Sequence, residues 1–188
     1  DTIVTDYVIL PRINKRYERD SSGNTISVKY YNSAGNEYTQ EELTSARQMI
    51  KEHIVKYGAI ATMTGGNLTE FYNNSDAFKA TAYNCNLTTK VRDHAITIVG
   101  WDDNFPASAF PTNPYVNGAW LVRNSWTTET GNSMDSYFWL SYADKGLSDT
   151  AYIMDFAPAG TYQKMYQYDG AFTVGAAPAV IRKAANVF

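Results

Sequence analysis

The sequence predicts an α+β fold built from one amphipathic helix and several short antiparallel strands. Only the segment after Thr39 places apolar residues at helical spacing between clear start and stop signals. Most of the remaining chain consists of strand-like segments separated by stretches rich in Gly, Asn, Pro and Ser, which are typical of antiparallel connections rather than β-α-β crossovers. With 188 residues, 44% hydrophobic and 19% charged, the chain has the size and composition of one globular domain.

The N-terminal part is expected to contain two strands, at residues 3–10 and 26–31. A polar stretch lies between them, and its Ser-Ser-Gly-Asn sequence at 21–24 predicts a turn. A second turn, at 32–36, separates these strands from the helix.

The helix has recognisable signals at both ends. Thr39 and Glu42 form a capping box, and Gly58 stands where a C-terminal cap belongs. His53 lies on this helix among charged neighbours, which is typical of a surface histidine. The apolar stripe of the helix is formed by Leu43, Ala46, Ile50, Ile54 and Tyr57.

Beyond the helix the sequence predicts strands, followed by a tail with weak secondary-structure signals. The tail from Ala157 onward is rich in small residues and tyrosine, and it is expected to be a linker. The predicted strands are Ala59–Thr64, about Ala80–Tyr83, His94–Trp101, Ala119–Asn124, Tyr137–Tyr142 and Ala151–Phe156.

Composition excludes several functional classes. A net charge of −3 without a basic run argues against nucleic-acid binding. No apolar run approaches the length of a membrane span, and one cysteine excludes an internal disulfide. The residues after Asp1 do not form a signal peptide, so we expect that a preceding segment has been removed. Fifteen tyrosines with many Asn, Thr and Ser residues favour an extracellular surface.

A histidine and an asparagine are predicted to meet at one edge of the sheet. If His94–Trp101 and Ala119–Asn124 pair antiparallel, His94 lies next to Asn124, with Trp126 two residues further on. An amide that holds one ring nitrogen, shielded by an indole, is the arrangement that a general base needs. Alternation would place on one face of each strand the residues His94, Ile96, Ile98 and Gly100, and Trp120, Val122 and Asn124.

Three segments carry a family resemblance: Asp-His-Ala-Ile-Thr-Ile-Val-Gly-Trp, Gly-Ala-Trp-Leu-Val-Arg-Asn-Ser-Trp and Tyr-Phe-Trp-Leu-Ser-Tyr. Together they resemble the C-terminal β-lobe of papain-like cysteine peptidases, in particular bacterial secreted members with a Gly-Trp-Asp-Asp segment. The resemblance covers roughly residues 40–156. It implies an antiparallel, β-barrel-like lobe with one packed helix over residues 1–156. Residues 157–188 would then be a linker and the start of a truncated lectin-like domain.

The resemblance also implies roles for individual residues. His94 would be the catalytic base, Asn124 would orient it, and Trp126 would cover their contact. A cysteine thiolate paired with the imidazolium would attack the peptide carbonyl, and the histidine would protonate the leaving amine. The family builds the wall of its S2 subsite from positions that correspond to Met63, Ala61 and Asp93.

The sequence departs from the family pattern after Trp126. Where the family has glycines, this chain has Thr127–Asn132, which is largely built from threonine, glutamate and asparagine with a single glycine. Because β-branched residues restrict the backbone, a different loop and different primed subsites are expected here.

The only cysteine, Cys85, does not match the family's nucleophile. That nucleophile occurs in a Gln…Gly-x-Cys-Trp context roughly 130–150 residues before the histidine, which would be ahead of Asp1. Cys85 matches a position where relatives have a structural cysteine, and free cysteines are often buried. A Cys85–His94 dyad and a metal site are the alternatives, the latter weakened because two nitrogen or sulfur ligands do not complete a zinc shell.

The predicted function is therefore that of a thiol endopeptidase acting on polypeptides without a metal or cofactor. The chain would supply His94 and Asn124, and a separate N-terminal segment or chain would supply the cysteine, so the chain alone would be incomplete and inactive. A fragment captured alone is the other explanation, but the exposed apolar face of an isolated lobe favours a docked partner. The expected location is secreted or at a bacterial cell surface. The alternative function is that of a non-catalytic pseudo-peptidase or adhesin.

Overall fold

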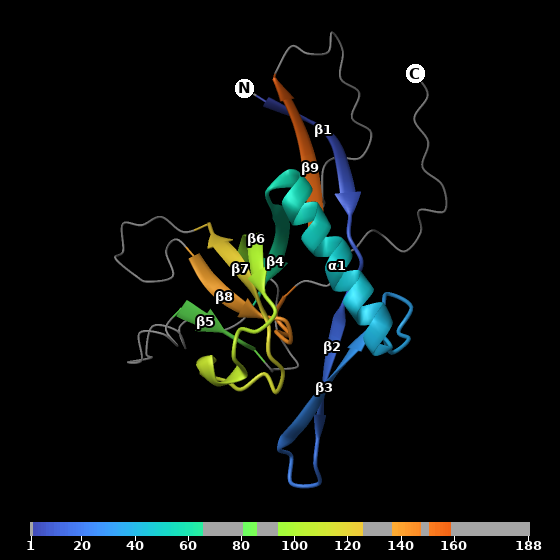
Figure 1. Ribbon diagram of the computed structural model, residues 1–188, viewed down its shortest axis with the longest axis vertical. Coiled ribbons are helices and arrows are strands. Elements are labelled where there is room, and N and C mark those ends of the chain that lie inside the picture. Colours follow the sequence, from blue (N-terminus) through green and yellow to red (C-terminus); the bar gives the residue numbers. More distant parts are fainter. Residues whose placement is uncertain (1, 66–80, 86–93, 126–136, 148–150, 159–188) are drawn as a thin grey trace, which may run out of the picture.

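The computed structural model describes residues 2–65, 81–85, 94–125, 137–147 and 151–158. For residues 2–7 and 151–157 it describes the backbone and not the side chains. In this part of the chain, α1 lies against a seven-stranded sheet and next to a two-stranded hairpin (Figure 1). The elements are β1 (Thr2–Ile9), β2 (Asn14–Arg19), β3 (Thr25–Tyr31), α1 (Gln40–Tyr57), β4 (Ile60–Thr64), β5 (Ala82–Tyr83), β6 (His94–Asp102), η2 (Ala107–Ala109), β7 (Ala119–Asn124), β8 (Tyr137–Ser141) and β9 (Ala151–Pro158).

The large sheet has the strand order β1-β9-β4-β6-β7-β8-β5. Its neighbouring strands run antiparallel, as expected from the sequence, except that β5 runs parallel to β8. A strand of two residues that is not joined to its neighbour by a hairpin has no turn to fix its direction, which explains the exception. The α+β class, with one packed helix and a mainly antiparallel sheet, is confirmed.

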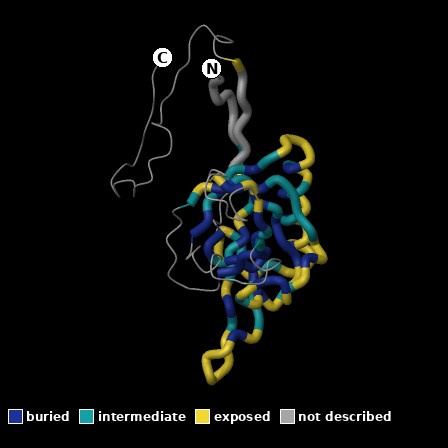
Figure 2. Tube along the Cα trace, turned by 90° about the vertical axis from the view of Figure 1, so that its left-hand side faces the viewer, coloured by how far each residue is buried: buried dark blue, intermediate teal, exposed yellow. Residues whose placement is uncertain are grey.

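The β2–β3 hairpin contains a strand that the sequence did not predict. β2 carries charged residues on both sides of Tyr17, so it lacks the alternating apolar pattern of a buried strand. Only Tyr17 on it is buried, and the other residues of β2 are half-buried or exposed. The turn is held by Asp20, whose carboxylate accepts the backbone N–H groups of Ser22 and Asn24 at 2.9 and 2.8 Å. Figure 2 shows this turn as an exposed tip.

Helix α1 follows its sequence signals closely. Thr39 and Glu42 form the reciprocal capping box, and the N–H of Gly58 donates to Ile54 O at 2.7 Å. Gly58 has a φ of 84°, in the left-handed region that a glycine adopts without strain. The Nδ1–H of half-buried His53 donates to Met49 O at 2.7 Å, which supports a local surface role. The buried face is formed by Leu43, Ala46, Ile50 and Ile54, whereas Tyr57 is 38% exposed.

Strand β6 contains a β-bulge that corrects one detail of the predicted faces. Ile98 pairs with Val122, but the next pairs are Gly100 with Leu121 and Trp101 with Trp120. The extra residue shifts the alternation by one, so Gly100 does not share the face of His94 as predicted.

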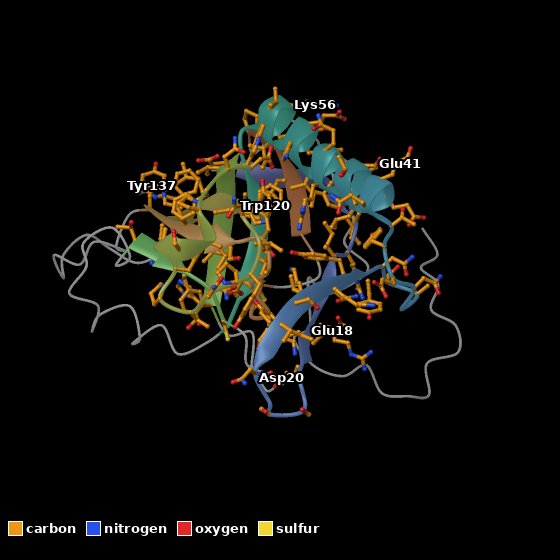
Figure 3. All side chains as sticks on the ribbon, turned by 60° about the horizontal axis from the view of Figure 1, so that its bottom comes forward. Glu18, Asp20, Glu41, Lys56, Trp120 and Tyr137 are labelled. Carbon is orange, nitrogen blue, oxygen red and sulfur yellow. The ribbon has the colours of Figure 1, made fainter. Side chains whose placement is uncertain are left out.

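The main core lies between α1 and the sheet. Trp120 sits in it with its ring 4.6 Å from that of Tyr142, and Figure 3 shows Trp120 in the interior, between the sheet and α1. A second apolar cluster, around Phe105 and Phe110, packs against Trp139. None of the helices in the described residues is long and apolar enough to cross a membrane.

Candidate functional site

The structure brings His94 and Asn124 together. Asn124 is the last residue of β7 and faces Ile96, so His94, two residues earlier on β6, lies diagonally across from it. The Nε2 atom of His94 is 2.7 Å from Oδ1 of Asn124. Asn124 is 4% exposed, whereas the histidine is only half-buried and can be reached from outside. The antiparallel contact predicted from the sequence is present.

A backbone group fixes the orientation of this asparagine. The N–H of Ser125 donates to Asn124 Oδ1 at 2.8 Å, so the atom that faces the histidine is the amide oxygen. An amide oxygen only accepts, and Nε2 of His94 must therefore carry the proton in this contact. In the neutral ring, Nδ1 is then the basic nitrogen. This is the tautomer that a general base acting through Nδ1 requires.

A buried threonine stands on the other side of the histidine. Thr64, at the end of β4, pairs with His94 in the sheet and is completely buried. Its hydroxyl has no hydrogen-bond partner among the described residues. A buried hydroxyl without a partner is costly, so this position bears on the stability of the site.

Two of the predicted substrate-contacting residues lie close to the histidine along the sheet, on its other face. Met63 pairs with Ala95 and Ala61 pairs with Thr97, and the alternation of β4 turns both away from α1. Met63 is half-buried and Ala95 is exposed, so together they form an accessible apolar surface next to His94 along the strands, on the opposite face of the sheet. Ala95 was not predicted, although its place directly after the histidine is a signal that could have identified it. Asp93 and Trp126, like residues 127–132, lie outside the described residues.

Cys85 is far from this pair. It follows β5, and β7 and β8 separate β5 from β6, so about 14 Å of sheet intervenes at about 4.8 Å per strand. The register adds to the separation, because Arg123 near the histidine pairs with Tyr137, whereas Tyr83 pairs with Leu140 at the other end of β8. The structure therefore does not form a Cys85–His94 dyad.

The surroundings of Cys85 are those of a structural residue. It is 5% exposed, its N–H donates to Asp144 Oδ2 at 2.6 Å, and its carbonyl accepts from Lys145 N at 2.8 Å. Burial raises the pKa of Asp144 to about 7, against the opposing effect of the N–H groups of Cys85 and Leu147 and the charge of Lys15. The described residues contain no cluster of three or more metal-ligating side chains.

The loop around Asp144 also reaches the end of the strand beside the histidine. The N–H of Gly65, next to Thr64, donates to Gly146 O at 3.0 Å. A Cβ at Gly146 would stand 2.0 Å from the carbonyl oxygen of Gly65, so this close approach requires a glycine. Asp144, which accepts Leu147 N at 2.6 Å, thus helps to hold the segment that supports β4.

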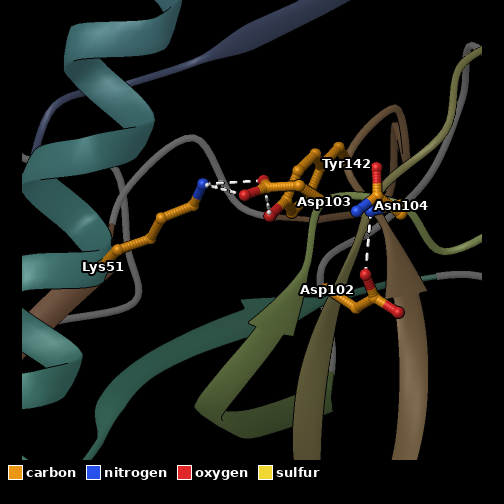
Figure 4. A network of polar contacts seen from close by, with 5 residues as sticks. All are labelled: Lys51, Asp102, Asp103, Asn104 and Tyr142. Carbon is orange, nitrogen blue, oxygen red and sulfur yellow. Dashed lines mark hydrogen bonds and ion pairs between the residues drawn. The ribbon is translucent and has the colours of Figure 1, made fainter.

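The acidic turn after β6 is explained by local contacts. Asp103 accepts from Lys51 at 2.7 and 2.8 Å and from the hydroxyl of Tyr142 at 2.9 Å, and Asp102 accepts from Asn104 N (Figure 4). Burial alone would raise the pKa of Asp103, but these bonds and the charge of Arg47 hold it below its ordinary value.

Comparisons with known proteins show the family to which this fold belongs. The family model described as "Papain family cysteine protease" matches residues 8–155. A solved structure of the clostridial cysteine protease Cwp84 after propeptide cleavage is similar, with a TM-score of 0.53 and 37% identity over 65% of this chain. So is a structure of the cysteine protease and lectin-like domains of Cwp84, a surface-layer-associated protein of Clostridium difficile, with a TM-score of 0.51 and 37% identity over 63% of this chain.

The chain spans 30% and 25% of those two structures, respectively. No curated protein sequence matches it significantly. The family model extends over most of the chain and includes every strand on which the His94–Asn124 pair depends. The resemblance recognised in the sequence is confirmed: the chain belongs to the papain family of cysteine proteases.

Proposed function

We propose that this chain supplies the histidine and asparagine of a thiol endopeptidase site, and that a separate N-terminal segment or chain supplies the nucleophilic cysteine. The observation that carries the proposal is the 2.7 Å contact between His94 Nε2 and Asn124 Oδ1, with the amide oxygen fixed by Ser125 N–H. A histidine with a purely structural role does not require an oriented amide at the accessible ends of two inner strands.

The proposed mechanism uses each nitrogen of the ring for one task. Nε2–H stays bonded to Asn124, while Nδ1 takes the proton of the cysteine thiol and leaves a thiolate–imidazolium pair. The thiolate attacks the peptide carbonyl, and the imidazolium gives its proton to the leaving amine. His94 then takes a proton from water, which attacks the thioester and releases the acid and the thiol.

The position of Cys85 supports the need for a second segment. Three strand spacings and the register of β8 separate this thiol from His94, so it is out of reach of the base. Without the other segment, we expect the chain to be inactive.

The apolar surface beside the histidine would contact the substrate. Met63 and Ala95 form its centre and Ala61 extends it along β4. Asp93 would contribute to the same wall, and Trp126 would cover the His94–Asn124 contact. A polypeptide with an apolar side chain at this subsite is the proposed substrate.

We further infer a domain division and a location. Residues 1–156 would form the peptidase lobe, and 157–188 would be a linker and the start of a lectin-like domain. The similar clostridial protein is described as a surface-layer-associated protein with a lectin-like domain, which supports a secreted or cell-surface location in a bacterium.

A non-catalytic, adhesive role is the second candidate, favoured by one observation. Residues 127–132 lack most of the glycines that the family carries after this tryptophan. A binding protein, however, would have no use for the tautomer that Asn124 imposes on His94.

Peptide hydrolysis by the complete protein, with the N-terminal segment present, distinguishes the peptidase from the adhesive role. His94→Ala is expected to reduce kcat/KM by about 10³-fold or more, as loss of a general base does. His53→Ala is the matched control, because it removes the other histidine from the surface of α1, and it should leave kcat/KM unchanged. Absence of hydrolysis in the unmodified protein, or equal rates in both variants, would favour the adhesive role.

A further inference from the structure

The buried carboxylate of Asp144 joins segments that lie far apart in the sequence. Its Oδ2 accepts the N–H of Cys85 and its Oδ1 accepts the N–H of Leu147, both at 2.6 Å. The side chain is completely buried at the centre of the loop 143–147. Because a buried carboxylate costs free energy that its hydrogen bonds only offset, this group is better explained by the geometry that it fixes than by stability.

The same loop is bonded to the end of β4, beside the histidine. Gly146 O accepts the N–H of Gly65 at 3.0 Å, and Gly65 directly follows Thr64. Thr64 in turn pairs with His94 in the sheet, so the loop acts about 3.4 Å along the strand from the neighbour of the histidine. A Cβ at Gly146 would stand 2.0 Å from Gly65 O, so the loop and the strand end fit closely.

The loop is also bonded to the end of β5 and to the hairpin. Cys85 O accepts from Lys145 N at 2.8 Å, so Cys85 is held through both its N–H and its carbonyl. The hydroxyl of Tyr17, on β2, lies 3.1 Å from Oδ1 of buried Asn84 and 3.0 Å from Ala143 O. Three parts of the fold therefore meet at this loop, and the carboxylate of Asp144 lies between them.

We propose that Asp144 is a positioning residue for His94. The carboxylate fixes the loop, and the loop carbonyl at Gly146 fixes Gly65. The strand pair of Thr64 with His94 carries this position to the imidazole. The role rests on the proposed function of His94 as the base. A base acts only within hydrogen-bond reach of its proton, and a displacement of about 1 Å costs up to about 100-fold in rate.

Asp144→Asn tests this role because it keeps the shape of the side chain and removes one acceptor. An amide has one accepting oxygen, so its NH₂ group would face one of the two N–H groups that the carboxylate accepts. The value of kcat/KM of the complete protein should fall about tenfold, within the range expected for a displaced base. Gly146→Ala, whose added methyl group must push Gly65 away, should cause a similar fall.

The ring nitrogens of His94 report its position independently of hydrolysis. This chain contains two histidines, so ¹⁵N spectra show His94 together with His53 of α1, which is an internal reference. In the unmodified protein the proton of the neutral His94 ring should be on Nε2, which faces Asn124 Oδ1. In Asp144→Asn the share of the Nδ1–H tautomer should rise, whereas the signals of His53 should stay unchanged.

Two control variants distinguish positioning from a general loss of stability. Asp20→Asn makes the same chemical change at a carboxylate that accepts two backbone N–H groups in the hairpin turn. Thr39→Ala destabilises α1 at its N-cap. Both should leave kcat/KM and the His94 spectrum unchanged. A folded Asp144→Asn protein with an unchanged rate and spectrum, or equal changes in the controls, would overturn the proposal.

Hydrogen exchange of the unmodified protein tests the loop without any variant. The amides of Gly65, Cys85 and Leu147 should exchange with one common opening free energy, because the same loop holds all three. Three different opening free energies would overturn the proposal. Absence of hydrolysis in the unmodified protein would instead contradict the peptidase function, and the His94 spectrum would still test the positioning role.

Discussion

At the scale of single residues, the site is defined by which atoms have partners. Asn124 Oδ1 accepts from both the imidazole and a backbone N–H, so its position is fixed twice. Thr64, paired with the histidine on the other neighbouring strand, is buried, and its hydroxyl has no partner among the residues that the structure describes. These two residues lead to opposite expectations when their polar groups are removed.

Removal of the Asn124 amide should impair catalysis. In Asn124→Ala the imidazole loses the acceptor that fixes its tautomer, and a fall in kcat/KM of about 10²-fold is expected. Asn104→Ala, in the turn after β6, is the control and should leave the rate unchanged. Steady-state kinetics of the complete protein measure this, and an Asn124→Ala variant with normal kcat/KM would refute the orienting role.

Removal of the Thr64 hydroxyl should stabilise the protein. Valine has nearly the same shape, so Thr64→Val eliminates a buried group without a partner and should raise the free energy of unfolding by about 1 kcal/mol. Thr62→Val, two residues earlier on the same face, is expected to lower it, because the Thr62 hydroxyl is not among the buried groups that lack a partner in the described residues. Urea unfolding of both variants measures these changes. A loss of stability in Thr64→Val would show that the Thr64 hydroxyl has a partner.

At the scale of secondary-structure elements, strong local signals could be read from the sequence. The capping box at Thr39, the stop at Gly58 and the bounds of β7 agree with the structure. Strand β2 was not predicted, because charged residues lie on both sides of its tyrosine and the strand has no apolar pattern. The bulge in β6 was not predicted either, since one inserted residue changes the pairing without changing the composition of the strand.

The start of α1 offers a test at this scale. Thr39→Ala removes the acceptor for Glu42 N, a contact of 3.2 Å, and should cost about 1 kcal/mol of stability. Thr44→Ala, inside the helix, should be neutral or slightly stabilising because alanine is the better helix former. Chemical denaturation measures the stability of both variants. Equal losses of stability in Thr39→Ala and Thr44→Ala would contradict the capping role of Thr39.

The loop around Asp144 gives the protein an expected pH dependence. Its pKa is raised from 3.8 to about 7, so the folded state favours the protonated acid. This contribution to stability is fully present below about pH 4 and is lost as the pH rises through about 7. Asp144→Asn, which mimics the neutral acid, should remove this decline. The free energy of unfolding of both proteins, measured from pH 4 to 8, tests this prediction. A parallel decline in the two proteins would contradict it.

At the scale of the whole molecule, the order of the strands in the sheet, and not the separation in sequence, decides which side chains can reach His94. Cys85 is nine residues from His94 in sequence, yet two strands and the length of β8 lie between them. Asn124 is thirty residues away and in contact. The site pair was predictable because its two strands carry clear patterns and were expected to pair antiparallel.

The central claim is that His94 serves a thiol that is not Cys85. Peptide mapping after treatment of the complete protein with a thiol-directed, substrate-like inhibitor tests this directly. The inhibitor is expected on a cysteine of the N-terminal segment, with labelling lost in His94→Ala and retained in Cys85→Ser. Labelling of Cys85, or labelling of the N-terminal cysteine that persists without His94, would contradict the account.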